Sequence, residues 1–244
     1  MAKLRPQNLT LTGALPRDRP TPGRAHRVYL ALTNHCNRSC PWCSTCSSPA
    51  GSTWLSEQDF RAALPGEGRF EVQLEGGEPT LHPKLGALIA HARSRPGCER
   101  VVLVTNGVVL PRERDALRDW LEPLGTPLTL KLSINHHLLA RDPELLKLAQ
   151  LLSELLVPPQ RELVLNVRLR PDAPGADAWV EQAVRDAGLL DLANVFHLQA
   201  YGFAAARDWE RPFVVGSNFR LINPDGADLG VDLVQRSEAM RVLP

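Results

Sequence analysis

The chain has 244 residues, of which 43% are hydrophobic and 23% charged, so it can bury a full core as one domain. The 28 Lys and Arg balance 27 Asp and Glu, and this net charge of +1 argues against a nucleic-acid partner. No stretch approaches the roughly 18 to 20 continuous apolar residues that a bilayer span needs, and the first residues lack an apolar signal core. The sequence therefore predicts a cytoplasmic protein with no membrane partner.

The cysteines are clustered. Four of the five lie between Cys36 and Cys46, and in a reducing compartment such a cluster indicates a metal or redox site rather than a disulfide scaffold. Cys36, Cys40 and Cys43 share one short loop, so their three thiolates could converge on a soft metal centre and leave a fourth position open. A structural zinc site is the alternative, with Cys46 or His35 as its fourth ligand.

Residues 1–26 are predicted to form an irregular basic arm, because Pro16, Pro20 and Pro22 prevent a regular element late in the segment. Two interpretations of its positive charge stay open. The arm could clamp an anionic substrate or peptide, or it could be a solvated leader on the outside of the fold.

Six strand and helix steps are predicted to follow. Strand patterns cover residues 27–32, 70–74, 100–104, 128–134, 163–169 and 195–200. Helical patterns between them cover about 57–64, 83–93, 112–121, 143–156 and 176–187. Short connections require parallel strands with right-handed crossovers, so the expected fold class is α/β, a partial (β/α)6 barrel over residues 27–203. Polar residues or glycine at each strand end favour a barrel with one functional mouth over a flat doubly wound sheet.

After about residue 203 this alternation stops. Residues 219–222 and 227–233 are predicted to form a hairpin around Pro224-Asp225-Gly226, followed by a helix over about 235–241. The extension formed by residues 204–244 is expected to close one end of the barrel.

Three motifs at strand ends resemble those of radical S-adenosylmethionine (radical SAM) enzymes. They are Cys36, Cys40 and Cys43 with Trp42 before the third thiol, then Gly76-Gly77-Glu78-Pro79, then Thr105-Asn106-Gly107. The resemblance implies that the thiolates hold one 4Fe-4S cluster, whose fourth iron is chelated by S-adenosylmethionine (SAM). It also implies that reductive cleavage of SAM gives a 5′-deoxyadenosyl radical that abstracts a substrate hydrogen. The implied partners are a small-molecule or peptide substrate and a reductant such as flavodoxin or ferredoxin.

The resemblance also indicates which residues bind the cofactor. Gly76 and Gly77 would let the backbone approach SAM without a Cβ, and the carbonyl or Glu78 region there would receive the methionyl ammonium. The other expected cofactor-binding positions are Trp42, Pro79, Thr105, Asn106, Ser133, Asn135, Asn166, Arg168, His197 and Gln199. For most of them the alternative is an ordinary packing or polar role inside the barrel.

No cysteine follows Cys98, so one cluster and no auxiliary cluster is expected. Three classes of function stay open: a radical enzyme acting on a small molecule or peptide, an activase that installs a glycyl radical on a partner protein, and a zinc-binding or otherwise non-enzymatic module. The strand over 128–134 lacks the Asp-Leu-Lys signature expected of activases. Intact motifs at three strand ends favour the first class.

Overall fold

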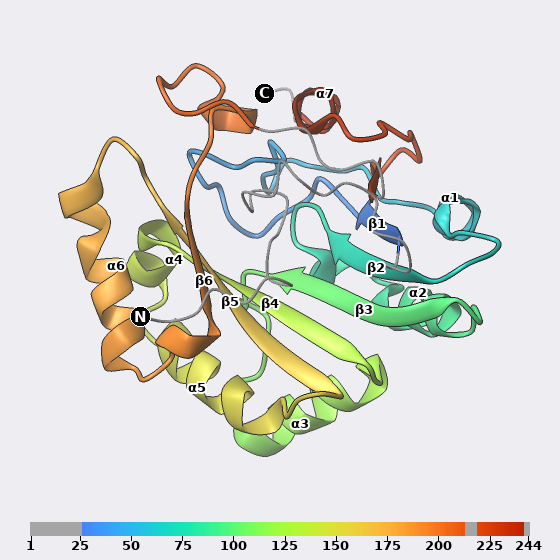
Figure 1. The fold of residues 1–244 in the computed structure, drawn as a ribbon, viewed down its shortest axis with the longest axis horizontal. Helices are drawn as coiled ribbons and strands as arrows, with labels where there is room; N and C mark the ends of the chain where they lie inside the picture. Colours follow the sequence, from blue (N-terminus) through green and yellow to red (C-terminus); the bar gives the residue numbers. More distant parts are fainter. Residues whose placement is uncertain (1–25, 213–218, 242–244) are drawn as a thin grey trace. The chain divides into compact units, whose positions relative to one another are not determined.

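The computed structural model describes residues 26–212 and 219–241 (Figure 1). The basic arm predicted over 1–26 therefore lies outside the described residues, apart from His26. The described chain forms two compact units. We call residues 26–104 with 199–241 the cysteine unit, and residues 105–198 the asparagine unit.

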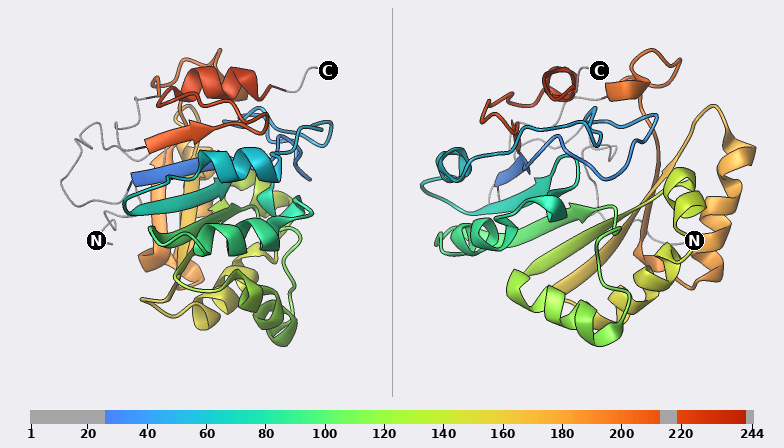
Figure 2. Two further views of the ribbon diagram at one scale, coloured as in Figure 1. Left: turned by 90° about the vertical axis from the view of Figure 1, so that its right-hand side faces the viewer. Right: turned by 180° about the vertical axis from the view of Figure 1, so that it is seen from behind.

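The cysteine unit is built on four parallel strands. Their order is β3 (Cys98–Thr105), β2 (Phe70–Glu75), β1 (His26–Ala31) and β7 (Phe219–Ile222). Helices α1 (Glu57–Ala63) and α2 (Leu85–Arg93) lie on one face of these strands (Figure 2). The short helices η2 (Pro79–Leu81) and η5 (Gly202–Ala204) and the C-terminal helix α7 (Leu233–Ala239) complete the unit.

Residue alternation separates the two faces of this sheet. The apolar pairs across β1 and β2 are Val28 with Val72 and Leu30 with Leu74, and all four side chains are buried. The opposite face is polar, and its pairs across the two strands are Arg27 with Glu71, Tyr29 with Gln73 and Ala31 with Glu75. Polar side chains on a buried face of a sheet need hydrogen-bond partners.

The asparagine unit has three parallel strands in the order β4 (Leu128–Ile134), β5 (Arg161–Leu169) and β6 (Ala193–His197). Helices α4 (His136–Arg141), α5 (Leu145–Leu155) and α6 (Pro174–Asp186) pack against β4 and β5. Helix α3 (Arg114–Leu121) and the short helices η3 (Glu122–Leu124) and η4 (Leu190–Leu192) lie in the connections. Each crossover thus returns through a helix, as parallel pairing requires.

The predicted α/β class with parallel strands is confirmed. Each of the six predicted strands overlaps an observed one, and the strands within each unit pair in parallel. Ser56 caps α1, its hydroxyl accepting from the Asp59 amide at 3.0 Å. The prediction missed α4, which Asn135 caps in the same way.

The C-terminal hairpin is confirmed only in part. The chain turns at Asn223–Gly226 and returns antiparallel, with the Leu229 amide donating to the Leu221 carbonyl at 2.9 Å. Residues 227–233 nevertheless form no strand, apart from one bridge between Ile222 and Asp228. A turn at residues 230–231 and the start of α7 at Leu233 end the returning segment early. On its other edge β7 pairs in parallel with β1, a long-range partner that local patterns do not reveal. No helix within the described residues is both long and apolar enough to cross a bilayer.

Candidate functional site

The three motif cysteines lie on the loop between β1 and α1, and none of them forms a disulfide bond with another described residue. The loop folds back on itself, because the Cys36 amide donates to the Ser48 carbonyl at 3.0 Å. A tight turn joins the other two, with the Cys43 amide donating to the Cys40 carbonyl at 3.1 Å. Trp42 is half-buried within that turn. The spacing of two residues between the second and third cysteines is thus the spacing of one turn.

The Cys36 thiol is the most buried of the three, at 8% exposure. Burial, followed by the nearby charges of Glu78, Cys43 and Cys40, raises its pKa to about 12. The motif thiols are therefore close enough to disfavour each other's ionisation. A bound cationic centre would remove this repulsion, since metals take up cysteine as the thiolate.

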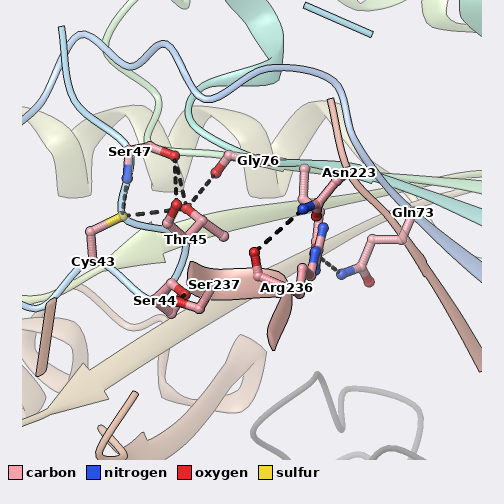
Figure 3. A network of polar contacts seen from close by, with 10 residues as sticks. Cys43, Ser44, Thr45, Ser47, Gln73, Gly76, Asn223, Arg236 and Ser237 are labelled. Carbon is pink, nitrogen blue, oxygen red and sulfur yellow. Dashed lines mark hydrogen bonds and ion pairs between the residues drawn. The ribbon is translucent and has the colours of Figure 1, made fainter. Parts of the chain in front are cut away.

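Two residues that the sequence reasoning did not single out contact the Cys43 sulfur (Figure 3). The Ser47 amide donates to it at 3.4 Å, and the Thr45 hydroxyl lies 3.4 Å away. Hydrogen bonds to cysteine sulfur adjust the reduction potential of an iron-sulfur centre. Hydroxyl residues within a few positions of a cysteine motif are the signal that could have identified them.

The Gly76-Gly77 turn packs against the backbone of the cysteine loop. The Gly77 amide donates to the Thr33 carbonyl at 2.6 Å, and the Glu78 amide donates to the His35 carbonyl at 2.9 Å. A Cβ on Gly77 would lie 2.0 Å from the His35 carbonyl oxygen, so only glycine allows this approach. The glycine backbone therefore lies directly against the cysteine loop.

Glu78 is buried at 1% exposure and its carboxylate faces its own turn. The carboxylate caps η2 by accepting from the Thr80 amide at 3.2 Å, and it also accepts from the Thr80 hydroxyl. Pro79 is the first residue of that helix and is also buried. These contacts fix the turn beside the cysteine loop.

The cysteines of this loop are candidate ligands for one of two metal centres, a single zinc ion or a 4Fe-4S cluster. Within the described part of the chain, no group of three or more His, Cys, Asp or Glu side chains is gathered around a single ion position. A polynuclear cluster takes its thiolates one per iron, so it does not require such convergence. Three thiols on one loop, with a backbone amide donating to one sulfur, fit a 4Fe-4S cluster held by Cys36, Cys40 and Cys43.

The C-terminal residues contact the cysteine loop at its third cysteine. The Phe203 amide donates to the Cys43 carbonyl at 3.0 Å, and the Ser237 hydroxyl donates to the Ser44 carbonyl at 2.6 Å. Cys46, which is fully buried, also points toward α7, its sulfur 3.7 Å from the Ser237 hydroxyl. No local sequence signal predicts these contacts, because they join residues far apart in the chain.

In the asparagine unit, two predicted cofactor-binding residues and one further polar residue lie in one row across the strands. Ser133, Asn166 and Asn194 occupy the same register on β4, β5 and β6, so their side chains project from the same face. Asn166 is 1% exposed, and neither atom of its amide group has a hydrogen-bond partner among the described residues. Lys131, buried at 2%, is on this face by alternation and was missed by the sequence reasoning. A lysine inside an apolar strand is the signal that could have identified it.

Three predicted positions of this unit have local structural roles. The Thr105 hydroxyl accepts from the Gly107 amide and the Asn106 side chain accepts from the Val108 amide, both at 3.0 Å. Asn135 caps α4, accepting from the Leu138 amide at 3.0 Å. These bonds leave the other side-chain atoms available to a ligand. They also give a local structural reason, a turn or a helix cap, for a polar residue at each of the three positions.

The last three predicted positions differ in exposure. The Arg168 guanidinium lies over the Phe196 ring, 5.5 Å from its centroid. His197 is exposed at the end of β6, whereas Gln199 is buried and lies beyond the strand. The strand predicted over 195–200 ends earlier than expected, because β6 stops at His197 and leaves Gln199 outside it.

Solved structures define the class of fold. The chain is similar to Streptococcus suis SuiB bound to precursor peptide SuiA, with a TM-score of 0.57 at 12% identity over 84% of this chain and 59% of that one. A second structure of SuiB, bound to S-adenosylmethionine, matches with a TM-score of 0.50 at 12% identity over 84% of this chain and 60% of that one. These likenesses support a parallel α/β partial barrel.

The family model described as "Radical SAM superfamily" matches residues 30–149, which include the cysteine motif, the Gly-Gly-Glu-Pro motif and the Thr-Asn-Gly motif. The chain belongs to the radical SAM superfamily of enzymes, whose members bind a 4Fe-4S cluster and SAM.

Curated relatives match over a shorter stretch. The GTP 3′,8-cyclase of Chlorobaculum tepidum is 37% identical over 93 residues, 37% of this chain and 28% of the relative. The GTP 3′,8-cyclase of Synechococcus sp. is 44% identical over 96 residues, 37% of this chain and 27% of the relative. The chain thus matches less than a third of the length of these relatives.

Proposed function

We propose that this protein reductively cleaves SAM at a 4Fe-4S cluster and uses the resulting radical to abstract a hydrogen from a small-molecule or peptide substrate. The observation that carries the proposal is the packing of the Gly76-Gly77 turn against the loop of Cys36, Cys40 and Cys43. When bound, the cluster and SAM supply a 5′-deoxyadenosyl radical.

The chain's own residues have separable roles in this proposal. Cys36, Cys40 and Cys43 hold the cluster, the Ser47 amide donates to the Cys43 sulfur, and the Thr45 hydroxyl contacts the same sulfur. The cofactor-binding positions expected from the sequence remain part of the proposal. They are Trp42, Gly76, Gly77, Glu78, Pro79, Thr105, Asn106, Ser133, Asn135, Asn166, Arg168, His197 and Gln199.

Two substrate classes have specific support. Relatives named GTP 3′,8-cyclase favour a purine nucleotide, and the fold neighbour solved with a precursor peptide is consistent with a peptide. The relatives match less than a third of their length, so we give GTP as the first small molecule to test rather than as the substrate. A flavodoxin or ferredoxin is the proposed reductant.

The proposal is tested with anaerobically reconstituted protein. We expect about four irons per chain, the absorption of a 4Fe-4S centre, and 5′-deoxyadenosine formation from SAM after reduction. Adding GTP or candidate peptides labelled with deuterium then identifies the substrate that transfers deuterium into 5′-deoxyadenosine.

Two cysteine variants form a matched pair for this test. Cys40→Ala should abolish cluster assembly, whereas Cys98→Ala, at the start of β3 and outside the motif, should keep the iron content of the wild-type protein. Equal loss of iron in both variants, or one zinc and no iron in the isolated protein, would contradict the proposal.

A further inference from the structure

Helix α7 buries an arginine whose charge is only partly used. Arg236 is 2% exposed, and its Nη1 forms an ion pair with Glu75 Oε1. The other carboxylate oxygen of Glu75 accepts from Gln73 Nε2 at 2.5 Å. Glu75 therefore holds the Arg236 guanidinium from one side, and Gln73 holds Glu75.

The opposite edge of this guanidinium makes no hydrogen bond to the described residues. Arg236 Nε and Nη2 are both buried and have no hydrogen-bond partner among the described residues. These two atoms form one edge of the guanidinium, and their N–H groups point in parallel. Buried N–H donors are rarely left without an acceptor, and such an edge matches the two oxygens of a carboxylate or phosphate.

A second atom beside Arg236 is also unpartnered. Asn223 is 1% exposed, and its Nδ2 donates to the Arg236 carbonyl at 3.4 Å, which brings the two residues together. Its Oδ1 has no partner within the described part of the chain. Two polar residues that are both incompletely satisfied indicate a polar ligand rather than an apolar filling.

The arginine belongs to the same polar network as the third motif cysteine (Figure 3). Glu75 directly precedes Gly76, whose carbonyl accepts from the Thr45 hydroxyl at 3.1 Å, and Thr45 in turn contacts the Cys43 sulfur. Ser237, the next residue after Arg236, is bonded to the Ser44 carbonyl. A ligand held by Arg236 would thus lie against the elements that support the cysteine loop.

We propose that the Nε and Nη2 edge of Arg236 binds an oxyanion, a carboxylate or phosphate, carried by the substrate. Glu75 is the positioning residue that orients the guanidinium. The inference rests on the proposed function only in calling the ligand a substrate, and it narrows the substrate class to molecules that bear an acidic group. The specificity of the enzyme then depends in part on α7.

Isothermal titration of the anaerobically reconstituted protein tests this site. Sodium phosphate and sodium acetate are the probes, with sodium chloride of equal ionic strength as the blank. Arg236→Lys keeps a positive charge beside Glu75 but removes the Nε donor and the planar fork, so we expect the dissociation constant of the bound probe to rise at least about tenfold. Glu75→Gln removes the competing carboxylate while keeping an acceptor for Nη1, so the same constant should fall.

Arg241→Lys is the matched control, because Arg241 is a partly exposed arginine paired with Glu238 just beyond α7. In this variant the dissociation constant of the bound probe should stay within about twofold of the wild-type value. The inference is overturned if neither anion binds the wild-type protein, or if Arg236→Lys and Glu75→Gln both leave binding unchanged. SAM cleavage in the same preparations is a separate readout: its absence with anion binding intact would count against the proposed function and not against this site.

Discussion

The Ser237 hydroxyl donates a 2.6 Å hydrogen bond to the Ser44 carbonyl and so joins α7 to the residue that follows the third motif cysteine. The Cys46 sulfur, 3.7 Å from the same hydroxyl, lies at the other end of this short segment. Cys46 has a backbone φ of +51°, in the left-handed region that residues other than glycine rarely adopt. Contacts to α7 thus stabilise a loop conformation that is locally unfavourable.

Ser237→Ala tests this role. The variant removes the hydroxyl that donates to the Ser44 carbonyl in a part-buried hydrogen bond, which should cost about 1 to 2 kcal/mol. For a chain of this size the melting temperature should fall by about 2 to 8 °C. Iron should also be lost faster to a chelator, because the loop segment after Cys43 is less restrained. Differential scanning fluorimetry and iron release measure the two effects.

The control for this prediction is Ser153→Ala. Ser153 in α5 also donates to a carbonyl at 2.6 Å, but its partner is Gln150 within the same helix, where water can replace the bond. Its melting temperature should change by less than about 2 °C. If Ser237→Ala released iron no faster than this control, α7 would have no part in holding the cysteine loop.

Gly77→Ala should prevent the Gly-Gly turn from packing on the cysteine loop. The added Cβ would meet the His35 carbonyl oxygen at 2.0 Å, and both partners are backbone, so one segment has to move. We expect iron incorporation during reconstitution to fall by about tenfold or more, because the His35 shift displaces the adjoining Cys36. Iron content per chain and the absorption of the cluster are the measurements.

Gly86→Ala is the comparison. Gly86 lies in α2, where an added Cβ meets no heavy atom within 4 Å, so the substitution should stabilise the helix by about 0.5 to 1 kcal/mol and leave iron content unchanged. If both variants bound iron like the wild-type protein, the contact between the turn and the loop would not be needed for cluster assembly.

Features that depend on neighbouring residues could be predicted from the sequence, whereas contacts between distant residues could not. The strand and helix order, the Ser56 cap and the cysteine turn were predictable because each depends on neighbouring residues. The contact between Ser237 and Ser44 was not, since the two residues are 193 positions apart and share no pattern. The same holds for the parallel pairing of β7 with β1.

The site shows the same division. The motif cysteines and the Gly-Gly turn were found from spacing, whereas the donors to the Cys43 sulfur and the buried Arg236 depend on how distant elements meet. Asn135 has a role that its position at a strand end did not reveal, because its side chain caps α4. Strand-end polar residues serve both purposes, and only coordinates distinguish them.

Asp177 in α6 should make the stability of the protein fall in acid. Burial alone would raise the pKa of this carboxyl, but hydrogen bonds from the Arg170 side chain and amide and the charge of His136 outweigh burial and lower the pKa. A carboxyl with a lowered pKa in the folded state contributes stability above its unfolded pKa, about 3.8, and loses it as the pH falls through the folded value.

Asp177→Asn should therefore destabilise the protein by about 2 kcal/mol at pH 7, with the difference from wild type shrinking below about pH 4. Urea unfolding at several pH values measures this difference. Asp115→Asn, at an exposed pair with Arg118, should change stability by less than about 0.5 kcal/mol at any pH. A difference for Asp177→Asn that stayed constant with pH would rule out the charged interaction as its cause.

Asn166→Leu should raise stability while removing a ligand contact. The amide of Asn166 is buried on β5 with no hydrogen-bond partner among the described residues, and an apolar side chain of similar volume ends that cost of about 1 to 3 kcal/mol. Without added SAM the melting temperature should rise by about 2 to 8 °C. If the amide binds SAM, the affinity for SAM should fall about tenfold, measured by equilibrium dialysis.

The same change at Asn135, whose amide caps α4, should instead lower stability by about 1 kcal/mol. A lower melting temperature for Asn166→Leu would mean that the amide is satisfied in the folded protein, and its assignment as a ligand-binding residue would lose its basis.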